Sequence, residues 1–198
     1  CCPAPHLPHP PGRLRWGNPT YKRLARRLLA ESSALSHLSL RARPMLQYLT
    51  VPVTPFQQNC SIVWCDATQE AAIIDAGGDI PVLLAEIKRL GLTLTALWVT
   101  HAHIDHAGAV GELADTLALP IVGPHTGDQF WIDGLAQQST MFGFAPARQF
   151  TPTRWLQDGD TVQIGRETLN VRHCPGHTPG HVVFHAPQMK RAFVGDVL

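Results

Sequence analysis

Three histidines and one aspartate lie within six positions of the stretch THAHIDHAG, residues 100–108. His101 and His103 are two residues apart, so in extended backbone their side chains point to the same side. Asp105 and His106 are adjacent, and their side chains point in different directions. Imidazole and carboxylate groups are suitable ligands for Zn, Mn or Fe. The stretch therefore predicts a metal site in which two histidines face one point and an Asp–His pair faces a neighbouring point.

Two later segments carry residues of the same chemical types. In CPGHTPGH, residues 174–181, prolines and glycines predict a tight loop that holds His177 in a fixed position. In FVGDVL, residues 193–198, a strand-like run delivers Asp196. A carboxylate at a strand end can bridge two cations a few ångströms apart. Both segments are therefore candidates to complete a site with two metal ions.

Alternating and short apolar runs predict most of the elements that must position these side chains. We expect strands at 45–53, 59–65, 70–78, 94–100, 120–124, on either side of Gly165 within 156–176, at 181–186 and at 191–196. We expect helices at 79–92 and 107–119, and a partly helical covering segment at 124–150. Hairpins that alternate with strand–helix units predict a layered α/β fold.

The helix expected at 79–92 has recognisable end signals. Asp79 is the expected N-cap, Pro81 lies near the first turn, and Gly91 is the expected terminator. The run at 94–100 is apolar on both faces, which indicates a buried strand. That strand leads directly into the histidine-rich loop, so the loop is expected at the edge of a buried sheet.

The chain changes character near Met45. Its 198 residues are 44% hydrophobic and 16% charged, which suits a packed domain rather than a disordered chain. Residues 1–44 hold eight Lys or Arg and one acid, a formal charge of +7, whereas residues 45–198 hold eight and fourteen, a charge of −6. We therefore expect a basic, Pro-rich N-terminal extension without a core at 1–44 and one domain at 45–198.

Three interpretations of residues 1–44 remain open. The one that we favour is upstream sequence translated in frame before a true start at Met45, because strand-like alternation begins there at once. An Arg- and Ser-rich, acid-poor segment also resembles an organelle transit peptide. A basic arm that binds nucleic acid nonspecifically is the third interpretation.

The cysteines and the hydropathy pattern suggest a cytoplasmic setting. The five cysteines are odd in number and form no CxxC pair, which argues against a disulfide scaffold. No apolar run approaches the roughly 20 residues that span a bilayer. We also find no signal-peptide pattern. We therefore expect a reduced environment, with neither a membrane nor a nucleic acid as partner.

HAHIDH, then PGHTPGH about seventy residues on, then GD resemble the metallo-β-lactamase-fold hydrolases in order and spacing. The similarity is greater to their glyoxalase II branch, the hydroxyacylglutathione hydrolases, in particular short bacterial members. The stretches VPVTPFQQNCSIVWC, IIDAGGD, GPHTGDQFW, LQDGDTVQIG and CPGHTPGHVVF carry this likeness. The resemblance covers residues 45–198 and none of 1–44. It implies an α/β fold of the αββα sandwich type.

The resemblance also implies two metal ions with a shared carboxylate. The implied ligands are His101, His103 and His177 for the first ion, Asp105 and His106 for the second, and Asp196 as the bridge. Family members supply a further histidine for the second ion from a later PGH segment, which these 198 residues do not contain. We therefore expect the second half of the sandwich to be incomplete and the domain to be truncated at its C-terminus. A minor departure is Ala76, where relatives usually carry proline.

The activity implied by the resemblance is thioester hydrolysis. A hydroxide that bridges two divalent ions, zinc rather than iron or manganese, would attack a hydroxyacyl-glutathione such as an S-lactoylglutathione-like compound. Asp105 is the implied catalytic residue, because it would bind the second ion and orient the hydroxide. Because a thiol has a pKa of about 8.5, the thiolate can depart without a strong general acid. Substrate-contacting residues are not implied. The alternatives are an iron-dependent persulfide dioxygenase of the same fold and an inactive fragment.

Other polar and aromatic residues are expected to have supporting or packing roles. Asp75 is expected to secure a turn or to support a ligand, and His181 to make a structural hydrogen bond at a strand start. Trp98, Phe130 and Trp131 are expected to pack rather than to stack on substrate. The histidines expected not to bind metal are His125, His173 and His185.

Overall fold

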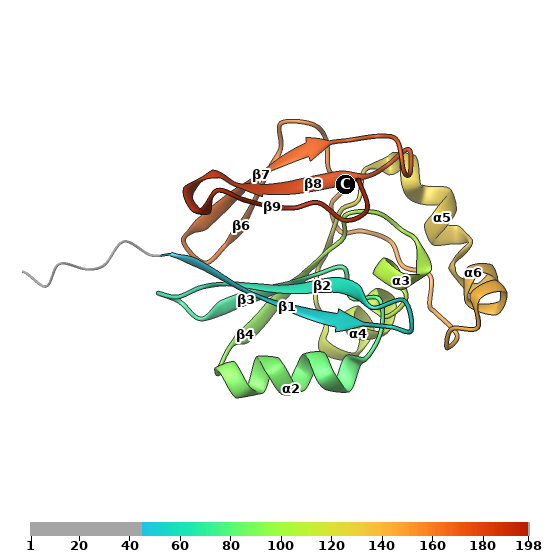
Figure 1. Ribbon diagram of the computed structural model, residues 1–198, viewed down its shortest axis with the longest axis horizontal. Helices are drawn as coiled ribbons and strands as arrows, with labels where there is room; N and C mark the ends of the chain where they lie inside the picture. The colour runs from blue at the N-terminus through green and yellow to red at the C-terminus, as the bar shows by residue number, and fades with distance from the viewer. Residues whose placement is uncertain (1–44, 198) are drawn as a thin grey trace, which may run out of the picture. The chain divides into compact units, whose positions relative to one another are not determined.

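The computed structural model describes residues 45–197, and these form two β-sheets packed face to face (Figure 1). The first sheet has the strand order β1-β2-β3-β4-β5, and the second β6-β7-β8-β9. The first sheet consists of β1 (Leu46–Val53), β2 (Gln58–Cys65), β3 (Glu70–Ile74), β4 (Thr93–Trp98) and β5 (Ile121–Val122). The second consists of β6 (Thr161–Ile164), β7 (Glu167–His173), β8 (Val182–Ala186) and β9 (Arg191–Phe193). The α/β class expected from the sequence is confirmed.

Six of the seven helical elements that the structure describes precede β6 in the chain, three among the strands of the first sheet and three after β5. The helical elements are α2 (Ile80–Leu90), α3 (Ile104–Ala107), α4 (Val110–Leu117), η1 (Thr126–Asp128), α5 (Gln129–Asp133), α6 (Leu135–Phe142) and η2 (Pro187–Met189). Figure 1 shows α2 and α4 beside the first sheet, and α5 and α6 at the end of the two sheets. Within residues 45–197, no α-helix follows β6.

Side chains of the first sheet alternate between two apolar cores. Ala71 and Ile73 of β3 pack in the core between this sheet and the helices, together with Leu97 of β4. Ala72 and Trp98 face the second sheet, where the rings of Trp98 and Phe184 lie 5.4 Å apart between centroids. Burial on both faces explains why these strands are almost continuously apolar.

The second sheet is buried on one face only. Leu169 and Val171 of β7 lie in the core between the sheets, whereas Thr168 before them and Arg172 after them are exposed and Asn170 between them is half-buried. This alternation is typical of a strand with one solvated face. The expected packing role of Trp98 is confirmed by its place in the core between the sheets.

Two helix predictions need correction. Asp79 precedes α2 but does not cap it, because its carboxylate accepts a hydrogen bond from the Thr54 N–H at 2.7 Å. Gly91 ends α2 as expected, in the left-handed region at φ +67°. The helix predicted at 107–119 is shorter, since α4 spans Val110–Leu117, and a separate helix, α3, precedes it at Ile104–Ala107. Asp105 and His106 therefore lie on a helix rather than on a loop.

Parallel pairing determines where the polar residues gather. β3, β4 and β5 run parallel, so their carboxyl ends lie at one edge of the sheet. Asp75 follows β3 at that edge, and Thr100 with His101 follows β4. His181 immediately precedes β8 in the second sheet. Polar side chains from four separate segments therefore gather at this edge. The segments are those after β3, after β4, before β8 and after β9.

The interpretations of residues 1–44 lie outside the described residues. Within residues 45–197, every helix is too short, or too poor in apolar residues, to span a lipid bilayer.

Candidate metal centre

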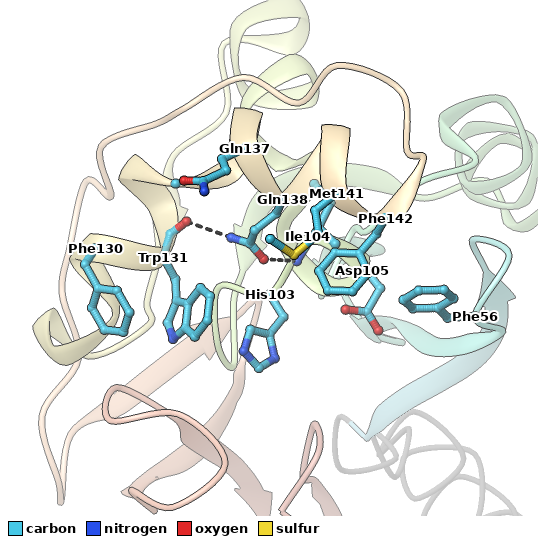
Figure 2. Close-up of a pocket in the computed structure, with 11 residues that line it drawn as sticks. Phe56, His103, Ile104, Asp105, Phe130, Trp131, Gln137, Gln138, Met141 and Phe142 are labelled. Carbon is cyan, nitrogen blue, oxygen red and sulfur yellow. Dashed lines mark hydrogen bonds between the residues drawn. The ribbon is translucent and has the colours of Figure 1, made fainter.

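The histidine-rich loop after β4 is fastened on one side by a buried glutamine of α6. The Gln138 side-chain oxygen accepts from the Ile104 N–H at 3.0 Å. Its amide nitrogen donates to the Trp131 carbonyl at 2.9 Å (Figure 2). The same nitrogen approaches the Ala102 carbonyl at 3.4 Å. Every polar atom of this buried side chain is thereby engaged. The contacts join α5, α6 and the loop that carries the histidines.

A buried aspartate fastens the same loop on its other side. Asp128 is fully buried, and its Oδ2 accepts from the Ala102 N–H at 3.0 Å and from the Thr178 hydroxyl at 2.8 Å. Its Oδ1 accepts from the Gly180 N–H at 2.6 Å. A Cβ atom on Gly180 would collide with the main chain of this segment, so glycine permits the close approach. Asp128 thus joins the loop after β4 to the loop that carries His177.

Asp75 supports the centre through hydrogen bonds with Thr100 and His106. Its Oδ1 accepts from the Thr100 N–H at 2.7 Å, and its Oδ2 from the Thr100 hydroxyl at 2.6 Å. The same Oδ2 lies 3.0 Å from His106 Nδ1. A carboxylate only accepts, so this contact places a hydrogen on Nδ1 and leaves Nε2 of His106 to face the centre. The expected supporting role of Asp75 is consistent with these contacts.

His101 is fully buried, and one of its ring nitrogens has no partner. The Thr100 hydroxyl, which donates to Asp75, lies 3.1 Å from His101 Nδ1 and accepts from it. His101 Nε2 then carries a lone pair, and no hydrogen bond satisfies it. Burial, reinforced by the neighbouring histidines, lowers the pKa of His101 well below its usual range. The ring is therefore neutral at neutral pH and has a free nitrogen ligand.

His103 and His177 come together from loops that are distant in sequence. His177 Nε2 lies 2.9 Å from His103 Nδ1. Burial and the nearby His177 lower the pKa of His103. One nitrogen of each of these rings and one of His101 lie within 4.8 Å of one another. We call His101, His103 and His177 the histidine group.

A second set of groups lies beside the first. His106 Nε2 is 3.1 Å from Asp196 Oδ1 and 3.6 Å from Asp105 Oδ2, although neither contact has hydrogen-bond geometry. Burial alone would lower the pKa of His106, but the carboxylates of Asp196 and Asp75 outweigh it and raise the pKa to about 10. His106 in turn lowers the pKa of Asp196. We call Asp105, His106 and Asp196 the mixed group.

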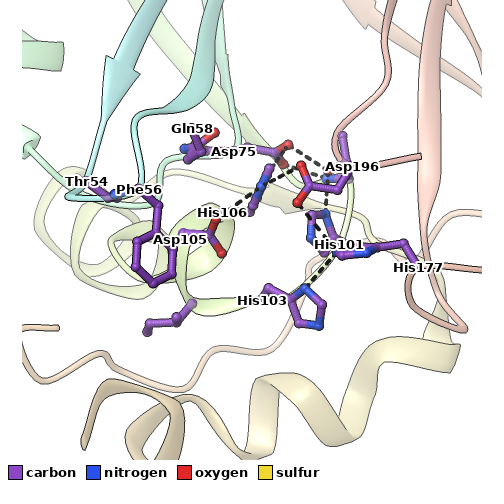
Figure 3. A network of polar contacts seen from close by, with 12 residues as sticks. Thr54, Phe56, Gln58, Asp75, His101, His103, Asp105, His106, His177 and Asp196 are labelled. Atoms are coloured by element: carbon purple, nitrogen blue, oxygen red, sulfur yellow. Dashed lines mark hydrogen bonds and ion pairs between the residues drawn. The ribbon is translucent and has the colours of Figure 1, made fainter. Parts of the chain in front are cut away.

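The structure brings all six residues expected as ligands into one place (Figure 3). Asp196 connects the mixed group to the histidine group, since its second carboxylate oxygen is 3.5 Å from His177 Nε2. The residues fit divalent metal ions on two grounds. The donor set is nitrogen and oxygen. In addition, the buried Nε2 atoms of His101 and His106 lack hydrogen-bond partners, which is costly unless another ligand satisfies them.

His181 has the structural role expected of it. It is fully buried, and its Nε2 accepts from the Asp196 N–H at 3.2 Å. Gly195 adopts φ +52°, and a Cβ atom there would collide with His181 and Thr100. His181 therefore helps to hold the main chain of Asp196 in place.

Two expectations for aromatic and imidazole side chains meet different outcomes. His125 and His173 stack on each other at 4.0 Å and belong to neither ligand group. Phe130 and Trp131 are not simply packed, because both line a cavity next to His103. Phe130 remains 53% exposed, so the packing expectation is wrong for this residue.

Sequence reasoning missed the roles of Asp128 and Gln138. An acid just before a helix indicates an N-cap, yet the Asp128 side chain makes no capping bond to α5. Gln138 lies within a helix of mixed character, where nothing distinguishes it from a surface residue. Only the tertiary contacts reveal that both side chains bond to the peptide groups around Ala102.

Comparison with known proteins gives consistent similarities. The family described as the Metallo-beta-lactamase superfamily matches residues 53–198. The chain is 42% identical over 149 residues to hydroxyacylglutathione hydrolase GloC of Haemophilus influenzae, covering 75% of this chain and 70% of that protein. It is also similar to the crystal structure of the BLEG-1 B3 metallo-beta-lactamase, with a TM-score of 0.68, 35% identity and coverage of 77% and 73% of the two chains. The structure of TTHA1623 in a di-iron-bound form gives a TM-score of 0.67 at 35% identity, covering 76% and 72%.

Proposed function

We propose, because the chain belongs to the metallo-β-lactamase superfamily, that it is a metal-dependent hydrolase of the glyoxalase II type that cleaves thioesters. The relative from Haemophilus influenzae is named a hydroxyacylglutathione hydrolase, and its 42% identity supports this reaction class. The observation that carries the proposal is the cluster of six nitrogen and oxygen ligands, which includes two buried imidazole nitrogens without partners.

The histidine group would hold one divalent ion and the mixed group the other. Asp196 would contribute to both, because its two carboxylate oxygens lie near His106 and His177 respectively. Such ions would act as Lewis acids and would lower the pKa of a water molecule to about 7. Zinc suits this donor set, and iron is an alternative that the di-iron form of TTHA1623 supports.

The side chains of this chain do the positioning. Asp105 points from α3 toward the cluster, where its carboxylate would orient the attacking water and accept its proton. Asp75 keeps the His106 ring in one orientation through Nδ1. A thiolate is a good leaving group, because its conjugate thiol has a pKa of only about 8.5. The described part of the centre accordingly needs no strong general acid for a thioester.

The test combines metal content with hydrolysis of S-lactoylglutathione. The full chain is loaded separately with zinc and with iron, and His103→Ala is compared with His185→Ala. His185 lies on β8 outside both ligand groups, so it is a matched control. We expect His103→Ala to lose bound metal and to abolish hydrolysis, and His185→Ala to retain both. Hydrolysis that survives His103→Ala would contradict the proposal.

β-Lactam hydrolysis is a second candidate, favoured by the 35% identity to the BLEG-1 B3 metallo-beta-lactamase. The same preparations are assayed with a chromogenic cephalosporin. Turnover of the cephalosporin without thioester cleavage would favour this second function. Oxygen uptake with a thiol persulfide, again without thioester cleavage, would favour the dioxygenase alternative that the sequence left open.

A further inference from the structure

A cavity of about 450 Å³ adjoins the ligand groups on the side of α5 and α6 (Figure 2). His103 and Asp105 form its inner wall, so it opens directly onto the candidate metal centre. The Trp131 ring meets His103 edge-on, with 4.7 Å between the ring centroids. A group bound in this cavity would therefore lie next to the bond that the centre is proposed to hydrolyse.

The cavity is lined by apolar side chains that are unusually exposed. Eight large hydrophobic side chains are exposed among the described residues, and four of them line this one cavity. These four are Phe56 (53% exposed), Phe130 (53%), Met141 (67%) and Phe142 (50%). Exposed apolar side chains that gather in a hollow indicate a binding site, whereas scattered ones need no explanation.

The charges around the centre differ between its two sides. We call the cavity beside His103, which Phe56, Phe130, Trp131 and Phe142 line, the aromatic cavity. Among residues 45–197, no lysine or arginine lines it, and Asp105 is its only charged side chain. A second cavity, of about 400 Å³, adjoins His106 and Asp196 on the other side. That one is lined mainly by polar residues and includes Arg191. The aromatic cavity therefore suits an uncharged, apolar group.

The wall of the aromatic cavity is tied to the metal-binding loop. Gln138 lines the cavity and holds both the Ile104 N–H and the Trp131 carbonyl. Phe56 packs edge-on against Phe142, at 6.1 Å between ring centroids, from the opposite rim. Because these contacts fix the wall relative to His103, the cavity is largely formed before a substrate binds.

We propose that this cavity binds the acyl group of the substrate and selects aryl or branched alkyl acyl groups over small hydroxyacyl groups. The proposal rests on the proposed thioesterase function. A peptide thiol of the glutathione type carries charged groups, which an apolar cavity without a cation would disfavour. The acyl group is the uncharged part of such a substrate. A lactoyl group would leave most of 450 Å³ unfilled, whereas a phenyl ring would meet Trp131, Phe130 and Phe142.

The first experiment measures the ratio of kcat/KM for S-phenylacetylglutathione to that for S-lactoylglutathione, with the full metal-loaded chain. We expect a ratio of about ten or more, since apolar complementarity typically changes specificity by about 10- to 200-fold. Phe142→Ser should lower the ratio about tenfold. The matched control is Val82→Ser, because Val82 is 49% exposed on α2 and lies outside the cavity. This control should leave the ratio unchanged.

A second experiment needs neither metal nor turnover. Phenylacetamide, a neutral probe, is titrated into the metal-free chain while tryptophan fluorescence is followed, with acetamide as the comparison. We expect a saturable change with phenylacetamide alone, and its loss in Trp131→Phe. No saturable change, or an unchanged response in Trp131→Phe, would contradict the cavity assignment.

The outcomes separate the two proposals. Cleavage of both thioesters with equal kcat/KM would overturn the acyl assignment and leave the thioesterase function standing. A ratio that Phe142→Ser and Val82→Ser change equally would also overturn it. Failure of the metal-loaded chain to cleave either thioester would instead overturn the proposed function itself.

Discussion

The histidine group and the mixed group lie side by side, yet they are constructed differently. The histidine group joins two loops that Asp128 ties together through main-chain and hydroxyl contacts. The mixed group joins α3 to the loop after β9, and Asp75 supports it through His106. Burial lowers the pKa of His101 and His103, whereas carboxylates raise that of His106. Two neighbouring groups of candidate ligands with such different surroundings should respond differently to mutation and to pH.

The largest expected difference comes from removing one ligand from each group. We expect His177→Ala to lose one of two bound ions and to reduce thioester hydrolysis by at least about a hundredfold, since misplacing a reacting group by about an ångström has an effect of that size. Asp105→Asn should also reduce hydrolysis, by about 10²- to 10⁴-fold, because it removes the proposed proton acceptor. It should nevertheless retain the ion of the histidine group, because three imidazoles remain. Metal analysis beside kcat/KM checks both. Equal metal loss in the two variants would show that the groups do not bind independently.

A smaller effect is expected from Asp128, which supports the histidine group alone. Asp128→Asn places an amide N–H₂ against donors that need an acceptor, at a cost of about 1–3 kcal/mol in the free energy of unfolding. The weakened loop should lower metal affinity at the histidine group about 10- to 100-fold, as loss of other outer partners does. Asp133→Asn is the control, because Asp133 is exposed on the same segment. Urea unfolding and metal titration measure the two effects, and a matching loss of affinity at the mixed group would contradict the comparison.

The smallest effect is the pH dependence of stability without metal. The folded-state pKa of His106, about 10, lies above its unfolded value, so its contribution is complete below about pH 6.5 and is lost as pH rises toward 10. The pKa of His101 is lowered, so the unfolded state binds its proton first, and stability falls as pH drops below about 6.5. The two histidines are therefore expected to change the free energy of unfolding in opposite directions, His106 at alkaline pH and His101 at acid pH.

Urea unfolding of the metal-free chain from pH 5 to pH 10 tests these opposite signs. His106→Gln should remove much of the alkaline loss, and His101→Gln much of the acid loss. If either variant kept the profile of the parent chain, the corresponding pKa shift would not be a source of stability.

The sequence predicts most of the fold and the ligand cluster because both depend on local patterns. Strands alternate with period two where one face is solvated, as in β7, and the ligands of α3 and the preceding loop are near neighbours in the chain. The expected roles of the six ligands stay predictions, as do the domain boundary at residue 45 and the cytoplasmic setting. Their spatial convergence is what the structure adds.

The remaining features depend on contacts between distant segments. Asp79 precedes a helix as a capping residue does, but its carboxylate instead accepts a hydrogen bond from the N–H of Thr54, 25 residues earlier. Asp128 and Gln138 reach main-chain atoms 26 and 34 residues away, so no local pattern reveals them. Phe130 looks like a core residue in sequence and lines a cavity in the structure. Composition alone does not distinguish an aromatic residue that packs from one that lines a binding site.

The attachment of Ala102 has a consequence for protein engineering. Asp128 accepts from its N–H and Gln138 approaches its carbonyl, so the loop is held by peptide groups that every amino acid except proline possesses. The path of the loop is therefore largely independent of the side chains at positions 101 and 103. A designer who wishes to change metal preference can exchange those ligands, for example for cysteine or aspartate, with the backbone scaffold already in place.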